Sequence, residues 1–163
     1  MASWDQIKDI RLLVNDPPGF VDIVAVANAA ALPTAPAQQT CYYLQDTKHY
    51  KATEKESGAV AADYTARWLR VSDERISDLV DTLGADSARC RVLRLLATKL
   101  GAEMQLSRTS MGGDESAYTS LRDMYAYYQG LASECEAEIA ADAENSTGRA
   151  ARMTSPEIAG GLT

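Results

Sequence analysis

The sequence predicts a mainly α fold, a small helical bundle with a β-hairpin insertion at about residues 38–71 and an extended C-terminal tail. Three observations predict it. Apolar residues recur at spacings of three and four along four stretches of the chain. Aromatic and β-branched residues flank a short polar turn near residue 46. Large apolar residues become scarce after residue 144. With 46% hydrophobic and 24% charged residues, the 163-residue chain can bury a core.

The first helix is expected from about Ser3 to Val14. Ser3 followed by Gln6 fits a capping box, in which each side chain binds the other residue's backbone N–H. The prolines and glycine of residues 15–19 then end the helix, because proline lacks a backbone donor. Its expected buried stripe is Ile7, Ile10, Leu13 and Val14.

The next part of the chain carries the strand signals. Residues 20–32 combine β-branched residues with a run of alanines, so periodicity leaves a strand and a helix both open. Residues 39–51 predict a hairpin around Asp46-Thr47. Residues 64–71 are a candidate third strand with imperfect alternation.

Three further helices are expected. The first begins at Ser72, whose side chain can cap it, and ends near Gly84. The second covers about residues 86–106, and the third about residues 114–141. In that third helix one seam alternates spacings of three and four: Tyr118, Leu121, Tyr125, Tyr128, Ala132, Cys135 and Ile139.

The C-terminal residues predict a tail rather than a helix. Residues 1–144 form the expected domain, and residues 145–163 contain Asn-Ser-Thr-Gly, Pro156 and a Gly-Gly pair. Such a segment cannot offset the entropy of ordering itself, about 1–2 kcal/mol per residue. We therefore expect it to be ordered against a partner; packing on its own domain is the alternative. The candidate contact residues are Arg149, Arg152, Met153, Ile158 and Leu162.

The sequence predicts no enzyme, cofactor or metal site. His49 is the single histidine, so any Ser-His-Asp or Cys-His arrangement would require it, and it lies in the expected hairpin. The three cysteines, Cys41, Cys90 and Cys135, are widely spaced without a paired motif. We expect them to be free, buried and in a reducing compartment. No apolar run of about 18 residues exists, so no membrane span is expected.

The charges suggest a protein interface. The net charge is −7, which disfavours a general nucleic-acid binder, because phosphate contacts supply much of that affinity. A basic group on the 86–106 helix precedes an acidic group late in the last helix. The two groups can pair within the chain or between copies; contact of the basic group with DNA phosphate is the alternative. The expected subunit-interface residues are Arg89, Arg91, Arg94, Glu134 and Glu138.

The order of these features resembles the head–tail connector (adaptor) proteins of tailed bacteriophages. The resemblance covers about residues 4–131. The matching motifs are Asp16-Pro17, Leu32-Pro33, Gln39-Thr40-Cys41-Tyr42, the 69–76 helix start, Gly84, and the 113–131 segment with Tyr118-Thr119-Ser120-Leu121 and Tyr127-Tyr128.

The resemblance implies a structural virion protein at the head–tail interface, assembled in the host cytoplasm. Such a protein forms a ring, usually a dodecamer, below the portal protein. Its C-terminal segment extends onto the portal, and its far side meets a stopper or tail-completion protein. Double-stranded DNA passes through the lumen without sequence-specific binding. The insertion at residues 38–71 departs from the smallest all-helical members, and we expect it to project towards a neighbour.

A DNA-binding packaging or regulatory protein, similar to a small terminase subunit, is the alternative function. The helices at 72–83 and 86–106, joined at Gly84, could form a helix-turn-helix. The negative net charge and the apolar interior of the second helix count against it.

Overall fold

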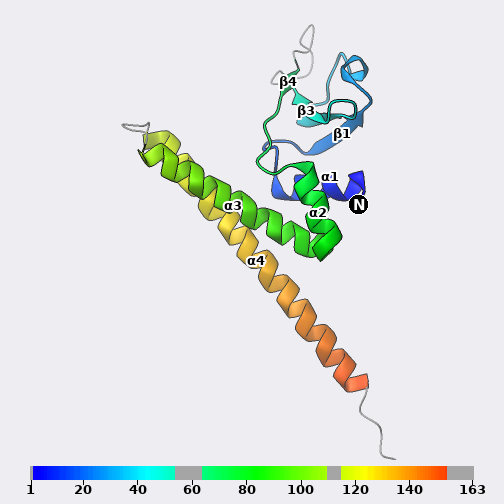
Figure 1. Ribbon diagram of the computed structural model, residues 1–163, viewed down its shortest axis with the longest axis vertical. Helices are drawn as coiled ribbons and strands as arrows, with labels where there is room; N and C mark the ends of the chain where they lie inside the picture. The colour runs from blue at the N-terminus through cyan, green and yellow to red at the C-terminus, as the bar shows by residue number, and fades with distance from the viewer. Residues whose placement is uncertain (1, 54–63, 110–114, 154–163) are drawn as a thin grey trace, which may run out of the picture.

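The computed structural model describes residues 2–53, 64–109 and 115–153 (Figure 1). The described elements are α1 (Trp4–Val14), β1 (Asp22–Val26), the 3-10 helix η1 (Ala29–Ala31), β2 (Thr40–Leu44), β3 (His49–Ala52), β4 (Thr65–Ala66), α2 (Asp73–Leu83), α3 (Ala85–Thr109) and α4 (Glu115–Met153). The sheet, α1 and α2 form a compact part, beside which α3 and α4 form a long antiparallel hairpin (Figure 1). No helix in the described part of the chain is long and apolar enough to cross a membrane.

The fold-class prediction is wrong, because the chain mixes helices with a four-stranded sheet. The strand order is β1-β2-β3-β4. β1 pairs with β2 in parallel, with Ile23 opposite Cys41, and the other pairs are antiparallel. The expected hairpin is the β2–β3 pair, with Tyr43 opposite Tyr50. It lies inside a larger sheet, since the ambiguous 20–32 segment supplies β1. Parallel pairing across a crossover leaves no local periodic signal, so the sequence did not predict it.

The sheet packs on α1. Ile23, Cys41, Tyr50 and Ala52 form the buried core of the sheet. Trp4 of α1 stacks on Tyr43, with ring centroids 4.2 Å apart. The candidate third strand is reduced to the two residues of β4.

The helices share a second core, which lies between α1, α2, α3 and α4. The expected stripe of α1 is wrong at one position: Leu13 is 61% exposed, and Arg11, one turn after Ile7, is buried in its place. The expected caps are present, with Ser72 before α2 and Gly84 after it at φ 80°. α3 follows Gly84 directly.

α4 is longer than predicted. The seam is confirmed where its side chains are described, because Tyr128, Ala132 and Cys135 are buried and Leu121, Tyr125 and Ile139 pack against the core. The predicted end near residue 141 is wrong, since the helix continues through residues 145–148 to Met153. Serine, threonine and asparagine each cost well under about 1 kcal/mol in a helix, glycine about 1, and the first proline after them is Pro156.

Two of the three cysteines are not free, which corrects the expectation from sequence. Cys90 of α3 and Cys135 of α4 form a disulfide between residues 45 positions apart. No local motif signals this pair, because each cysteine occupies an ordinary core position on its own helix. Cys41 is free and buried, as expected.

The capping box at Ser3 offers a test of the α1 boundary. The Gln6 amide donates to the Ser3 hydroxyl oxygen, and the Ser3 amide donates to the Gln6 side chain. We expect Ser3→Ala to lower the free energy of unfolding by about 1 kcal/mol, because it leaves helix donors uncapped. Urea denaturation measures this change; Ser3→Asp, which keeps an acceptor, is the matched control and should change it by much less.

Candidate interaction surface on the α3–α4 hairpin

The α3–α4 hairpin is held by apolar faces that meet along its length. α3 contributes Val92, Leu93, Leu96, Ala97 and Leu100, all buried. The two helices approach closely at Gly101, where an added Cβ would lie 3.3 Å from the Tyr125 ring. Glycine lowers helix propensity by about 1 kcal/mol relative to alanine, and the close packing on Tyr125 accounts for its presence inside α3.

Two ion pairs cross the outside of the hairpin. Arg94 Nη2 lies 2.6 Å from Glu136 Oε2, and Arg89 Nη2 lies 3.2 Å from Glu138 Oε2. Hydrogen bonding from Arg94 lowers the pKa of Glu136 and raises that of Arg94. The basic and acidic groups of the sequence thus pair within the chain at these positions.

This pairing changes the predicted subunit interface. Arg89, Arg94 and Glu138 are engaged inside the chain. Arg91 and Glu134 are exposed, and neither has an ion pair with another residue of the described ranges. Of the five predicted interface residues, these two combine an exposed side chain with a charge that has no ion-pair partner in the described residues.

A small cavity opens beside the disulfide, where the end of α1 approaches α3 and α4. Its volume is about 180 Å³, and Arg89 Nε donates a hydrogen bond to Cys135 Sγ at 3.3 Å in its wall. Apolar side chains line the cavity together with three charged ones. The lining residues are Leu13, Arg89, Leu93, Leu131, Glu134, Cys135 and Glu138. The exposed Leu13 that sequence placed in the core therefore helps to form this surface feature.

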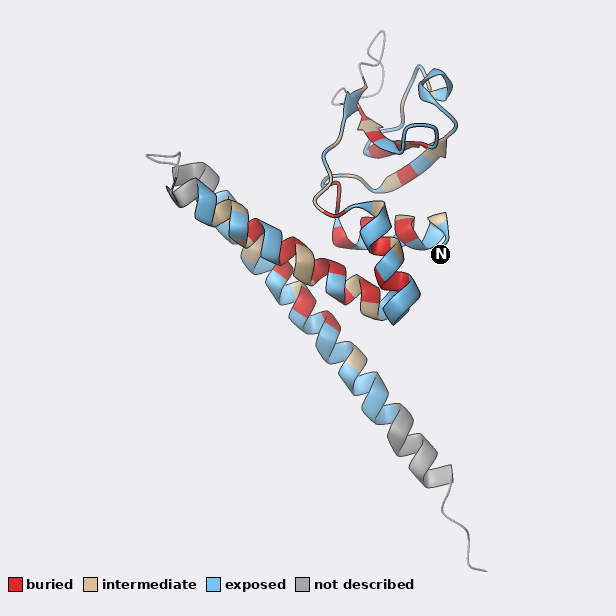
Figure 2. Ribbon diagram, viewed as in Figure 1, coloured by how far each residue is buried: buried red, intermediate tan, exposed pale blue. Residues whose placement is uncertain are grey.

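The last part of α4 projects beyond α3 as a single helix (Figure 2). Residues 140–145 are all exposed, so no face of this stretch packs on the rest of the chain. Arg149, Arg152 and Met153 belong to the same helix, although their side chains lie outside the described part. Ile158 and Leu162 fall outside the described residues altogether. We call residues 140–153 the arm.

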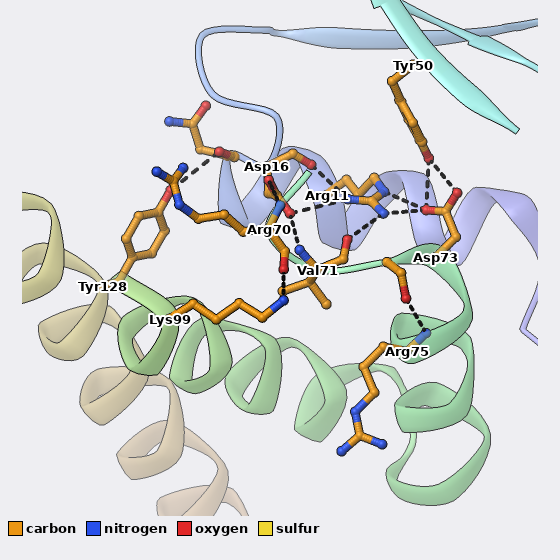
Figure 3. A network of polar contacts seen from close by, with 11 residues as sticks. Arg11, Asp16, Tyr50, Arg70, Val71, Asp73, Arg75, Lys99 and Tyr128 are labelled. Carbon is orange, nitrogen blue, oxygen red and sulfur yellow. Dashed lines mark hydrogen bonds and ion pairs between the residues drawn. The ribbon is translucent and has the colours of Figure 1, made fainter. Parts of the chain in front are cut away.

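A buried polar network fixes the compact part (Figure 3). Arg11 Nε donates to Asp73 Oδ1 at 2.7 Å, and its Nη2 donates to the Val71 carbonyl at 2.9 Å. Arg11 Nη1 lies 3.4 Å from Asp16 Oδ2, which also accepts from the Val71 amide. Tyr50 of the sheet donates to Asp73 at 2.9 Å. One guanidinium therefore ties α1, the sheet and the start of α2 together.

The side chains of this network hold one another in place. Arg11 is 1% exposed, and its donors are used by the carboxylates and carbonyls around it. Burial lowers the pKa of Arg11, but interactions with Tyr50, Asp73 and Asp16 outweigh it and raise that pKa overall. Burial also raises the pKa of Tyr50 well above its usual value. The sequence offered one signal, an arginine on the apolar face of α1.

His49 lies exposed in β3. Within residues 2–53, 64–109 and 115–153, no three His, Cys, Asp or Glu side chains are placed to hold a metal ion. Tyr127, off the seam of α4, is 58% exposed and contacts Tyr128 edge-on.

No family model matches the chain, and no curated protein or solved structure matches it significantly.

Proposed function

We propose that this chain is a structural virion protein, a head–tail connector that forms a ring below the portal and joins the capsid to the tail. It acts by packing and docking, with no catalysis. Its partners are the portal protein, further copies of itself, and a stopper or tail-completion protein. It works at the head–tail interface of the virion after assembly in the host cytoplasm, and double-stranded DNA passes through the ring.

The arm carries this proposal. A helix gains most of its stability in a protein from packing one face, and a short helix alone is marginal in water. Residues 140–145 pack on nothing within the chain, so a partner surface is what would stabilise them. A projecting arm ending in the segment with Arg149, Arg152 and Met153 suits a subunit that reaches onto a larger ring.

The surface charges suit a ring around DNA. Rings use heterologous interfaces, in which one patch meets a different patch of the next copy. Arg91 on α3 and Glu134 on α4 provide one patch of each sign. A net charge of −7 suits a channel through which DNA passes without tight binding to its phosphates.

A pull-down with the portal protein from the same viral genome tests the proposal. We expect the full chain to bind the portal, and a chain ending at residue 144 to lose most of that binding, by roughly tenfold or more, as for loss of hot-spot contacts. Arg149→Glu with Arg152→Glu should weaken it as well. Arg122→Glu, an exposed charge elsewhere on α4, is the matched control and should bind normally.

Absence of portal binding by the full, folded chain would sink the connector proposal. Full binding by the truncated chain would show that residues 145–163 are not needed for docking on the portal. The DNA-binding alternative has its own readout, a salt-dependent shift of duplex DNA at low micromolar protein. The packing of α3 disfavours it, because Val92, Leu93, Leu96 and Leu100 are buried within the fold rather than presented to a groove.

A further inference from the structure

We infer that Cys135 is a reactive thiol when the Cys90–Cys135 bond is open, attacking small cationic disulfides that enter the cavity beside it. Cys90 is then the resolving thiol that closes the bond. This reactivity does not depend on the connector proposal, because it follows from three features around one sulfur atom. They are an access route, a neighbouring cation and a second thiol within bonding reach.

The access route is the cavity of about 180 Å³. Cys135 lines it, and it is the one cysteine among the described residues that do so. Both cysteines are largely buried, Cys135 at 4% and Cys90 at 3% exposed, so the cavity lining is what distinguishes them. A small reagent inside the cavity meets Cys135, whereas Cys90 of α3 does not line it.

The neighbouring cation is Arg89. Its Nε donates to Cys135 Sγ at 3.3 Å, while its Nη2 is held by Glu138 at 3.2 Å. A guanidinium that donates to a bonded sulfur donates more strongly to a thiolate, because the thiolate carries a full negative charge. Cations beside a cysteine lower its pKa and raise the thiolate fraction, which is the nucleophilic form.

Cys41 provides the contrast within the same chain. It is fully buried in the sheet, and its thiol donates to the Lys51 carbonyl at 3.6 Å. Burial raises the pKa of Cys41 to about 12. At neutral pH this thiol stays protonated and enclosed, so it serves as an internal unreactive reference.

The exchange balances in two steps. The Cys135 thiolate attacks one sulfur of a small disulfide, forming a mixed disulfide and releasing one small thiolate. The Cys90 thiolate then attacks the Cys135 sulfur, closing Cys90–Cys135 and releasing the second small thiolate. Two electrons pass from the protein to the small disulfide. The two protons lost by the cysteines go to the released thiolates through solvent.

The cavity also selects by charge. Glu134 and Glu138 lie in its wall with Arg89 as the single cation. Because Arg89 is occupied by Cys135 and Glu138, the remaining field at the entrance is negative. Cystamine, with two ammonium groups, should therefore enter more readily than oxidised glutathione, which carries carboxylates.

The experiment uses the full chain with Cys90→Ala, so that the mixed disulfide at Cys135 accumulates. Reduced protein is treated with cystamine or oxidised glutathione at pH 7, and adducts are followed by intact mass and located by peptide mapping. We expect one adduct, at Cys135, with Cys41 unmodified and with cystamine reacting several-fold faster. Arg89→Gln should slow it by roughly three- to tenfold. Arg91→Gln, on the same helix, is the matched control and should react normally.

A second variant assigns the reaction to one of the two sulfur atoms. Cys135→Ala retains Cys90 behind the cavity, and its reaction with cystamine should be at least about tenfold slower than that of Cys135. Equal rates in the two variants, or an unchanged rate in Arg89→Gln, would overturn the inference. Circular dichroism of each variant confirms that the compared chains are folded.

Discussion

Arg11→Ala is expected to lower the free energy of unfolding by about 3–5 kcal/mol, because it leaves the buried Asp16 and the partly buried Asp73 without their cation. Asp16 is 2% exposed and lies 3.4 Å from the guanidinium, and Asp73 lies 2.7 Å from its Nε. The Val71 carbonyl loses its donor at the same time. The loss should appear as a lower urea midpoint and as weaker packing of the sheet on α1 and α2.

The matched control is Lys8→Ala on the same helix. Lys8 Nζ lies 2.7 Å from Asp22, but the two side chains are 28% and 47% exposed. Ion pairs in water are worth about 0–1 kcal/mol, so this variant should barely change stability. A similar small effect for both variants would contradict the structural role given to Arg11.

Opening the Cys90–Cys135 bond has the second large expected effect. The bond closes a loop between residues 45 positions apart, and the chain-entropy relation gives about 4 kcal/mol for a loop of this size. Measured values for single disulfides are typically about 2–4 kcal/mol. We expect the reduced protein to unfold at lower urea concentration than the oxidised protein by an amount in this range.

Cys90→Ala with Cys135→Ala separates the bond from other effects of reductant. This variant should match the reduced protein in stability, and reductant should not change it further. Cys41 remains in both chains and cannot account for a difference. The number of free thiols in the purified, unreduced protein can be counted after unfolding. We expect one free thiol, that of Cys41, when the Cys90–Cys135 bond is formed. Equal stability of oxidised and reduced protein would contradict the cross-link between α3 and α4.

Local signals in the sequence predicted the helices well. Caps at Ser3 and Ser72, the glycine after α2 and the seam of α4 are all properties of neighbouring residues, so a single sequence displays them. The β2–β3 hairpin is equally local, because its strands flank one short turn. These elements cover most of the described chain.

What the sequence did not show depends on distant contacts. The β1–β2 pair joins strands across a crossover, and the disulfide joins two helices. The position of Arg11 on the apolar face of α1 was visible in the sequence, but its partners Asp16, Tyr50 and Asp73 were not. α4 extends beyond its predicted end near residue 141. Residues 145–148 have low helix propensity but do not prevent a helix, and no proline occurs before Pro156.

The pairing of opposite charges on α3 and α4 was predicted, with pairing within the chain and between copies both left open. Opposite charges on α3 and α4 were expected to meet, and they do so within the chain as Arg89–Glu138 and Arg94–Glu136. In the proposed ring, Arg91 and Glu134 would form ion pairs with residues of a neighbouring subunit. From a single sequence, interface residues can be proposed only by their charge, because the sequence does not show which surface of the neighbouring subunit they would contact.

Electron microscopy of the portal protein mixed with the full chain tests the central proposal most directly. We expect a ring of this chain seated below the portal, with the arm of each copy extending onto the portal surface and an open channel along the axis. Portal particles that carry no additional ring, at protein concentrations where the chain is folded and in excess, would contradict it.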